Sequence, residues 1–314
     1  MNNNGFIKYL ENKGLAKTTQ EEYVSNTKLF FAWAKREDIQ VTKPDVLRYL
    51  EHLKNKGLQN VTRHNHLIAL NHYFTFLYQN NEIPLNPCLL LKIRGTYKKK
   101  LQKIYTPEEL DGIFDAYYQL FVRGYDDSHH RHEGQKQYAA LGRERNALIV
   151  SILFNQGITT KEIEKIEVND LDLIRATLKI RGGKRLKDRI LPLKASQIGL
   201  LMHYLQNTRP KLTEYHTIES EKLFLSLPAI SKKKTGGDTL VGVYATLTPQ
   251  IKTIDKQFFN FQQVRASVIT FWIKTQGLRK AQHMAGHSAI NTTEKYVSND
   301  LEDLTNDINK LHPF

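Results

Sequence analysis

Three short stretches near the end of the chain decide how the sequence is interpreted: Gln262-Gln-Val-Arg265, Ala285-Gly-His287-Ser and Thr292-Thr-Glu-Lys-Tyr296-Val. Arginine offers a planar, permanently charged fork to phosphate oxygens, and histidine offers a further hydrogen-bond donor. A tyrosine held beside them can lose its proton and attack phosphorus. Taken alone, each residue also fits a structural role, as a solvated arginine, a Gly-His helix end or a tyrosine that packs an amphipathic helix. Their order and spacing together predict a site that cleaves a phosphodiester.

Length and composition set the frame for this hypothesis. A chain of 314 residues is long enough for two domains, each with its own core. No apolar run approaches the ~18 residues of a membrane span, and the polar start lacks the form of a signal peptide. We therefore expect a soluble protein in the cytoplasm without a membrane partner. The single cysteine, Cys88, excludes an internal disulfide and a thiolate-cluster metal site.

The charge of the chain indicates its partner. Lys and Arg number 46 against 32 Asp and Glu, which gives a formal charge of +14 and a pI near 9.6. Such an excess attracts polyanions, and nucleic acid is the simplest one. Charge alone does not decide this, because basic residues also serve solubility.

Residues 1–93 are predicted to form an all-helical domain, because their apolar positions recur at helical spacing. Thr18 and Thr19, followed by two glutamates, indicate one capped helix start, and Thr42 with Pro44 indicates another. Gly14 and Gly57 are expected to end helices. A basic connector, residues 94–105, follows without an apolar period. It includes Lys98, Lys99 and Lys100.

Residues 106–314 are predicted to form the second domain, which starts with a capped helix at Thr106-Pro107. The pattern indicates a polar loop over 124–135, a buried helix over 143–154, a hairpin of strands 177–180 and 188–191, and a helix over 195–206. Residues 211–248 look loop-rich. From residue 258 onward three helices carry Arg265, lead into Gly286-His287 and bear Tyr296. Three histidines over 129–132 invite a metal, but they lack a defined zinc spacing, so we predict no metal site.

The C-terminal stretches resemble the tyrosine recombinase family (phage integrase and Xer-like), whose signature reads roughly His-x-x-Arg, Leu-Gly-His, Thr-Thr-x-x-Tyr. The likeness runs from about residue 15 to 300. Lys184, eight residues before Pro192, matches the family's β-hairpin lysine. Gln262 stands where the family has its first His, and Ala285 where it has Leu. Within Gly157-Ile-Thr159-Thr-Lys161-Glu162, which resembles the Gly-Leu-Arg-x-x-Glu box, Thr159 replaces the first of two phosphate-binding arginines.

The resemblance implies a mainly α fold, with an N-terminal helical core-binding (SAM-like) domain and a C-terminal mixed α/β catalytic domain that carries a small β-hairpin sheet. It implies that the first domain grips duplex DNA. Its basic and amide side chains would contact phosphates, and the candidates are Lys17, Arg63, His64 and Asn65. In the family the connector is a cationic strap between two domains that clamp DNA, so Lys98, Lys99 and Lys100 are further candidates, with a solvated linker as the alternative.

The resemblance also implies a mechanism without metal, nucleotide or other cofactor. Tyr296 would attack the scissile phosphorus and form a 3′-phosphotyrosyl bond, Lys184 would protonate the leaving 5′-oxygen, and Arg265 and His287 would hold the phosphate. Arg181 or Lys161 would replace the cation missing at Thr159, with Arg181 preferred because it lies at the root of the hairpin. The alternative function is a DNA-binding accessory protein that has lost catalysis.

The family further implies a homo-oligomer on DNA, a dimer to tetramer, that serves to integrate or resolve a mobile element. Leu301, Leu304, Ile308 and Leu311 form an apolar stripe after Tyr296. A tail helix with such a face is expected to dock onto a neighbouring protomer.

Overall fold

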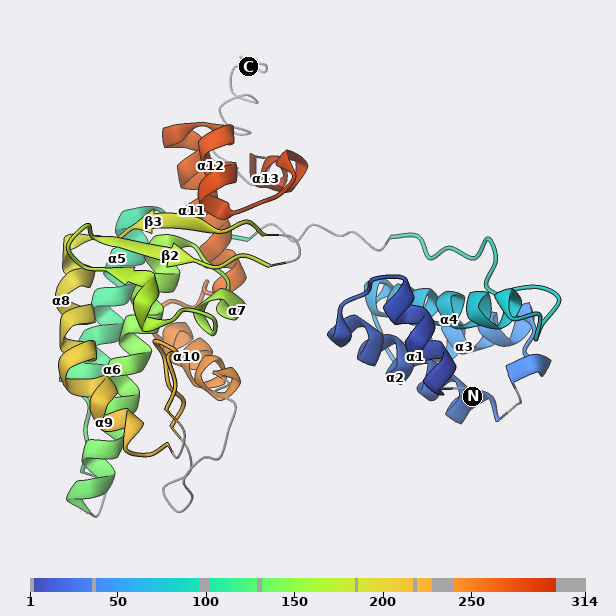
Figure 1. Ribbon diagram of the computed structural model, residues 1–314, viewed down its shortest axis with the longest axis horizontal. Coiled ribbons are helices and arrows are strands. Elements are labelled where there is room, and N and C mark those ends of the chain that lie inside the picture. Colours follow the sequence, from blue (N-terminus) through green and yellow to red (C-terminus); the bar gives the residue numbers. More distant parts are fainter. Residues whose placement is uncertain are drawn as a thin grey trace, which may run out of the picture. The chain divides into compact units, whose positions relative to one another are not determined.

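A computed structural model of the chain describes residues 3–35, 38–95, 102–128, 132–183, 186–216, 219–227 and 240–297 (Figure 1). The chain divides into two compact units, Met1–Lys100 and Leu101–Phe314. The change from one unit to the other falls within the basic connector predicted at 94–105.

The described residues of the first unit form four α-helices and one 3-10 turn (Asp38–Gln40); the α-helices are α1 (Asn3–Asn12), α2 (Lys17–Ala34), α3 (Lys43–Asn55) and α4 (Asn60–Gln79). They enclose a core rich in aromatic rings, and Phe6, Phe30, Tyr73 and Phe74 are fully buried. Aromatic side chains bury large apolar areas, so a small unit gains much of its stability from such a cluster. Cys88 is buried beside this core, and burial raises the pKa of its thiol to about 12.

Local sequence signals explain most of these helix ends. Thr42 starts α3 as predicted, with its backbone N–H donating to Asp45 Oδ2 at 2.9 Å. Gly14 and Gly57 follow helices with positive φ angles of 65° and 81°, as expected for glycine at a helix end. The predicted capped start at Thr18 and Thr19 is wrong. Helix α2 begins at Lys17, after Ala16, which supplies no side-chain cap.

In the second unit, α5 (Pro107–Tyr118) begins at the predicted Thr106 cap, whose hydroxyl accepts a hydrogen bond from the Glu109 N–H at 3.2 Å. A π-helical turn, Gln119–Arg123, continues it. The long helix α6 (Glu133–Gln156) forms the centre of the core and starts ten residues before the predicted position. The predicted polar loop is therefore shorter, because residues 133–135 are helical.

A small antiparallel sheet packs beside these helices, with the strand order β1 (Leu171–Asp172), β2 (Thr177–Ile180), β3 (Arg189–Pro192). The predicted hairpin is present as β2 and β3, and Ile180 pairs with Arg189. Side chains alternate between the two faces of a strand. In β3 this alternation buries Arg189 together with Leu191 and leaves Ile190 exposed.

The remaining helices complete the unit: α7 (Thr160–Ile163), α8 (Ala195–His203), α9 (Arg209–Thr213), α10 (Val241–Ile254), α11 (Phe261–Gln276), α12 (Leu278–Ala285) and α13 (Ile290–Val297). Helix α12 contacts β3 and α13 (Figure 1). The prediction of a loop-rich region over 211–248 is wrong in its last part, because α10 begins at Val241 and buries Leu247 and Ile251 in the core.

None of the described helices is long and apolar enough to span a membrane. Within the described residues, no group of three or more His, Cys, Asp or Glu side chains lies close enough to hold a metal ion. His132 precedes α6, whereas residues 129–131 of the histidine-rich segment lie outside the described part.

Candidate active site

Helix α11 places Arg265 inside the protein. The helix is capped by Asn260, whose side-chain oxygen accepts a hydrogen bond from the Gln263 N–H at 3.0 Å. Arg265 lies one turn further and is only 3% exposed. Gln262 is three residues before Arg265, on the same side of the helix, and is exposed.

The guanidinium of Arg265 is held by carbonyl groups at the ends of two other helices. Its Nη1 donates to Gly157 O at 2.6 Å, and its Nη2 donates to Ala285 O at 2.8 Å. Gly157 follows α6, and Ala285 is the last residue of α12. A cation at the C-terminal end of a helix is stabilised by the helix dipole. The two helix ends therefore fix the position of the charge.

His287 lies beside this guanidinium, immediately after Gly286, which ends α12 in the left-handed conformation with a φ of 74°. His287 Nε2 is 3.1 Å from Arg265 Nη2, and Nδ1 is 2.9 Å from Thr293 Oγ1. Arginine can only donate, so Nε2 must accept and Nδ1 carries the proton. Burial, together with Arg265 and Arg189, lowers the pKa of His287 to about 4, although Glu162 opposes this. His287 is therefore neutral at pH 7.

Helix α13 brings Tyr296 to the same place. Its ring stacks on the His287 ring with 5.8 Å between centroids and an angle of 8° between planes. Burial lowers the pKa of Arg265, whereas the charge of Glu162 and the hydrogen-bonding Tyr296 phenol act in the opposite direction. The structure thus brings Arg265, His287 and Tyr296 together, as the spacing of the three C-terminal stretches predicts.

Thr159 stands beside this group as a helix cap. Its backbone N–H and its hydroxyl donate to Glu162 Oε2 at 2.8 and 2.9 Å, and its hydroxyl accepts from the Glu162 N–H at 3.2 Å. This reciprocal pair starts α7. Thr159 therefore contributes no charge, and its hydroxyl is engaged with Glu162.

Two further ionisable residues that the sequence analysis did not assign complete the cluster. Glu162 is buried, and its Oε1 accepts from Arg189 Nη1 at 2.6 Å. Burial alone would raise the pKa of Glu162, but the hydrogen bond and charge of Arg189 hold it below its usual value. Arg189 also donates from Nε to Met284 O at 2.7 Å. A signal was available in the sequence: Arg189 shares the inward side of its strand with Leu191, and a buried arginine needs an anionic partner.

Comparisons with known proteins show the family of this chain. The model of the Phage integrase family matches residues 134–302, and that of the Phage integrase, N-terminal SAM-like domain, matches residues 4–81. The chain belongs to the phage integrase family. This confirms the predicted family, the mainly helical two-domain fold with its small sheet, and the enzyme class, a tyrosine-type site-specific recombinase.

Relatives of this integrase-family chain include tyrosine recombinase XerC of Bacillus licheniformis, 26% identical over 94% of this chain and 91% of the relative. XerC of Chlorobaculum parvum is 25% identical over 88% of this chain and 80% of the relative. Among solved structures, XerH bound to a palindromic difH substrate in a post-cleavage complex has a TM-score of 0.66 at 21% identity, covering 92% of this chain and 79% of that one. The Tn1549 transposon integrase with a circular intermediate DNA has a TM-score of 0.61 at 16% identity, covering 94% of both chains. The structural likenesses are evidence for the shared fold.

The hairpin of this integrase-family protein reaches the site through its backbone. Leu186 forms an antiparallel bridge with His287, and the Lys187 N–H donates to Gly286 O at 2.8 Å. Lys184, the predicted proton donor, lies outside the described residues, between Gly183 and Leu186. Its role remains a prediction from the motif. The contacts of Leu186 and Lys187 with His287 and Gly286 support it, because they bring this end of the hairpin to the site.

Arg181, the predicted replacement for the missing cation, has other partners. It forms a two-pronged ion pair with Glu167, and its Nε lies 3.1 Å from Asp170 Oδ2. The pKa of Arg181 is raised, first by the hydrogen bond to Glu167. The carboxylates of Glu167 and Asp170 thus balance the charge of Arg181. The arginine that lies beside Arg265, through their shared partner Glu162, is Arg189. Lys161, the other predicted replacement, is exposed on α7.

The predicted DNA contacts of the first unit differ in their surroundings. Lys17 is exposed at the start of α2, and Asn65 is half-buried on α4. Arg63 donates to Leu50 O at 3.1 Å and to Asn60 Oδ1 at 3.0 Å, so it also joins α3 to α4. His64 Nδ1 is buried without a hydrogen-bond partner among the described residues. Lys98, Lys99 and Lys100 lie outside the described part of the chain.

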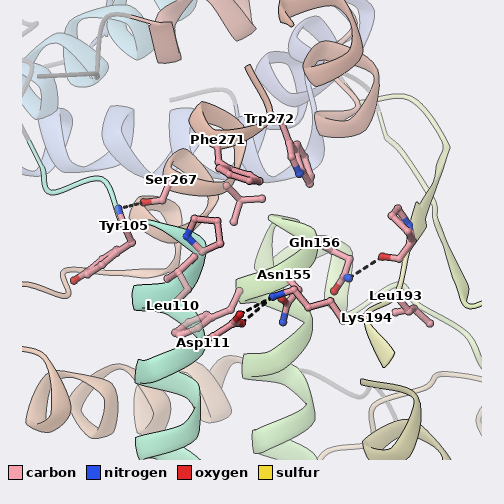
Figure 2. Close-up of a pocket in the computed structure, with 14 residues that line it drawn as sticks. Tyr105, Leu110, Asp111, Asn155, Gln156, Leu193, Lys194, Ser267, Phe271 and Trp272 are labelled. Atoms are coloured by element: carbon pink, nitrogen blue, oxygen red, sulfur yellow. Dashed lines mark hydrogen bonds and ion pairs between the residues drawn. The ribbon is translucent and has the colours of Figure 1, made fainter. Parts of the chain in front are cut away.

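A pocket of about 200 Å³ lies close to this site but does not contain its reactive side chains. Tyr105, Phe271, Trp272, Asn155 and Gln156 are among the residues that line it (Figure 2). Asn155 and Gln156 immediately precede the Gly157 carbonyl that holds Arg265. The pocket therefore borders the end of α6, which supplies the carbonyl that holds Arg265.

Proposed function

We propose that the protein is a site-specific recombinase that cuts and rejoins DNA strands through a 3′-phosphotyrosyl intermediate. The observation that carries this proposal is the convergence of Arg265, His287 and Tyr296 in one partly buried cluster. Among the described residues of this cluster, two guanidinium groups, Arg265 and Arg189, share the carboxylate of Glu162, and His287 is neutral. One positive charge is left over, and a phosphate is the anion that this reaction would supply.

In the proposed first step, Tyr296 loses its phenolic proton to solvent, and its Oη forms a bond to phosphorus as the bond from phosphorus to the 5′-oxygen breaks. Arg265 holds a non-bridging oxygen, and Lys184 gives its proton to the leaving 5′-oxygen. Attack by a second strand's 5′-hydroxyl reverses the step and restores the tyrosine. The covalent bond conserves the energy of the phosphodiester, so the proposed reaction requires no nucleotide.

Two positions define what this site lacks relative to the family signature. An ordinary tyrosine has a pKa of about 10, so its attack benefits from a base and from nearby cations. Gln262 cannot take up a proton, and Thr159 is neutral. Losing one donor to the transition state costs about 3 kcal/mol, or roughly a hundredfold in rate. We therefore propose slow but real cleavage.

The proposed partner is duplex DNA, bound by phosphate contacts on both units, which also implies a cytoplasmic location. Lambda integrase, which has the same fold, has been seen as a dimer bound to a core site and as a tetramer bound to a Holliday junction. We propose a homo-oligomer on DNA held by exchange of the C-terminal tail. The leucine-rich stripe of that tail lies outside the described residues. We also propose that the reaction integrates or resolves a mobile element.

A second candidate function, a DNA-binding accessory protein without catalysis, draws on specific observations. Gln262 is exposed with no base in its place, and the Thr159 hydroxyl serves as a helix cap. An accessory protein would need the charge of both units but not the stacked Tyr296.

One experiment separates the two functions. The protein is incubated with nicked duplexes cut from the DNA that flanks its own gene, and the products are run on a denaturing gel. We expect a covalent protein–DNA band from the wild type and none from Tyr296→Phe, which keeps the ring that stacks on His287. If the wild type binds these duplexes but never forms the band, the accessory function is correct.

A further inference from the structure

Arg189 is the least accessible charged side chain of the site. Its side chain is 0% exposed, and it joins three elements: it belongs to β3, donates to Glu162 on α7 and donates to the Met284 carbonyl on α12. It lies directly against Gly286, where an added Cβ would be 2.6 Å from Arg189 Nη1. Arg189 is thus packed between α7, which carries Glu162, and the end of α12, which lies next to Arg265 and His287.

The distances around Glu162 show how its charge is shared. Oε1 of Glu162 is 2.6 Å from Arg189 Nη1, whereas Oε2 is 3.8 Å from Arg265 Nη1. Oε2 is occupied by the backbone N–H and hydroxyl of Thr159. Glu162 is therefore matched mainly by Arg189, and Arg265 interacts with neutral partners, two carbonyls and an imidazole.

We propose that Arg189 is a positioning residue for strand cleavage: by holding Glu162, it keeps that carboxylate from neutralising Arg265, whose charge then remains for the scissile phosphate. The inference rests on the proposed function. It matters most in this chain because Thr159 supplies no second cation. Without Arg189, one carboxylate and one guanidinium would remain in the buried cluster and would pair with each other. The surplus positive charge would then disappear.

The electrostatics of His287 agree with this arrangement and give a readout that does not depend on cleavage. Among the described residues, the charged and titratable groups that face His287 are Arg265 on α11, Arg189 on β3, Glu162 on α7 and Tyr296 on α13. The two arginines lower the pKa of His287, and Glu162 raises it. Removal of the Arg189 charge should therefore raise the pKa of His287, and removal of the Glu162 charge should lower it.

The test compares Arg189→Met, Glu162→Gln and the double variant. Methionine keeps a long side chain without charge, and glutamine keeps the shape of the glutamate. We expect Arg189→Met to form the covalent adduct roughly a hundredfold more slowly, with little change in DNA affinity, because Arg189 itself is buried and the phosphate contact of Arg265 that it protects is one among many. The double variant should be at least tenfold faster than Arg189→Met, because the remaining amide cannot neutralise Arg265.

Two controls guard against a merely structural effect. Arg143→Met breaks a two-pronged ion pair with Asp127 elsewhere in the same unit and should leave the His287 pKa, measured by NMR, in place. Arg189→Lys keeps the charge and should lie between the wild type and Arg189→Met. If Arg189→Met does not fold, because a lone buried carboxylate is destabilising, the double variant and Arg189→Lys still decide the question.

The inference and the proposed function fail in different ways. An unchanged His287 pKa in a folded Arg189→Met protein would overturn the role of Arg189, even if the wild type cleaves DNA. Equal cleavage by Arg189→Met and its double variant would overturn it as well. Absence of any wild-type adduct would instead count against the proposed function, while the NMR titration would still test how Arg189 and Glu162 act on the site.

Discussion

Replacement of Gly157 by alanine should disturb both the stability of the second unit and the position of Arg265. Gly157 has a φ of 53° and a ψ of 28°, and an added Cβ would lie 2.8 Å from Val268 Cγ1 and 2.9 Å from Val268 Cβ. The left-handed conformation costs a non-glycine residue about 1 kcal/mol. Overpacking against a buried valine adds about 1–3 kcal/mol. We expect Gly157→Ala to lower the free energy of unfolding by about 2–4 kcal/mol in total.

The contact with Val268 supplies a matched control. Val268→Ala removes the Cγ1 contact but keeps the Cβ that would lie 2.9 Å from the added Cβ, and it leaves the backbone conformation of residue 157 unchanged. The double variant should therefore be more stable than the sum of the two single effects by about 1 kcal/mol, a part of the overpacking cost. DNA cleavage by Gly157→Ala should fall roughly tenfold or more, because the Gly157 carbonyl holds Arg265 Nη1.

Urea denaturation followed by tryptophan fluorescence measures these differences. The chain has two tryptophans, Trp33 and Trp272, and they belong to different units. A Trp33→Phe background leaves Trp272, whose ring would lie 3.6 Å from the added Cβ, as the reporter of the second unit. Wild-type stability in Gly157→Ala, or strict additivity with Val268→Ala, would refute the reasoning.

Three further predictions concern DNA, pH and assembly. Affinity for duplex DNA should fall steeply with salt as counterions are released, so a binding constant that stays flat from low to high salt would contradict a phosphate-dominated interface. The folded-state pKa of His287, about 4, lies below its ordinary value of 6.5, so its contribution to stability is full above pH 6.5 and is lost as the pH falls towards 4, by at most about 3 kcal/mol. Stability measured against pH should therefore fall less in His287→Gln than in the wild type, and parallel curves would refute the assignment. Truncation after Val297 should leave binding to a single site intact and weaken paired complexes on a gel, whereas unchanged pairing would exclude exchange of the tail.

The meeting of the three C-terminal candidate residues was predictable because the sequence places them close together. Arg265 lies on α11, His287 follows the end of α12 and Tyr296 lies on α13, so three consecutive helices bring them together and their spacing along the chain largely determines their proximity. The caps at Thr42 and Thr106 were predictable for the same reason, since a cap depends on residues three positions apart. Thr18 and Thr19 carry the same residue types, but α2 had already begun at Lys17.

Features that depend on tertiary packing were missed. Helix α10 contains Gly242, several β-branched residues and Pro249, all poor helix formers, yet Leu247 and Ile251 are buried in the core. The ion pair of Arg189 with Glu162 joins residues 27 positions apart, and only the fold of the hairpin over α7 brings them together. The choice of Arg181 as the replacement cation used its closeness to Lys184 in the sequence, which gives no information about the carboxylates of Glu167 and Asp170.

The most direct test of the central claim is to identify the atom that becomes joined to DNA. The covalent complex from a nicked duplex is digested with protease and nuclease, and the modified peptide is analysed by mass spectrometry. We predict a single adduct on Tyr296, joined to a 3′-phosphate, with a free 5′-hydroxyl on the released strand. An adduct on another residue, a 5′-phosphate linkage or the same adduct yield from Tyr296→Phe would contradict the account.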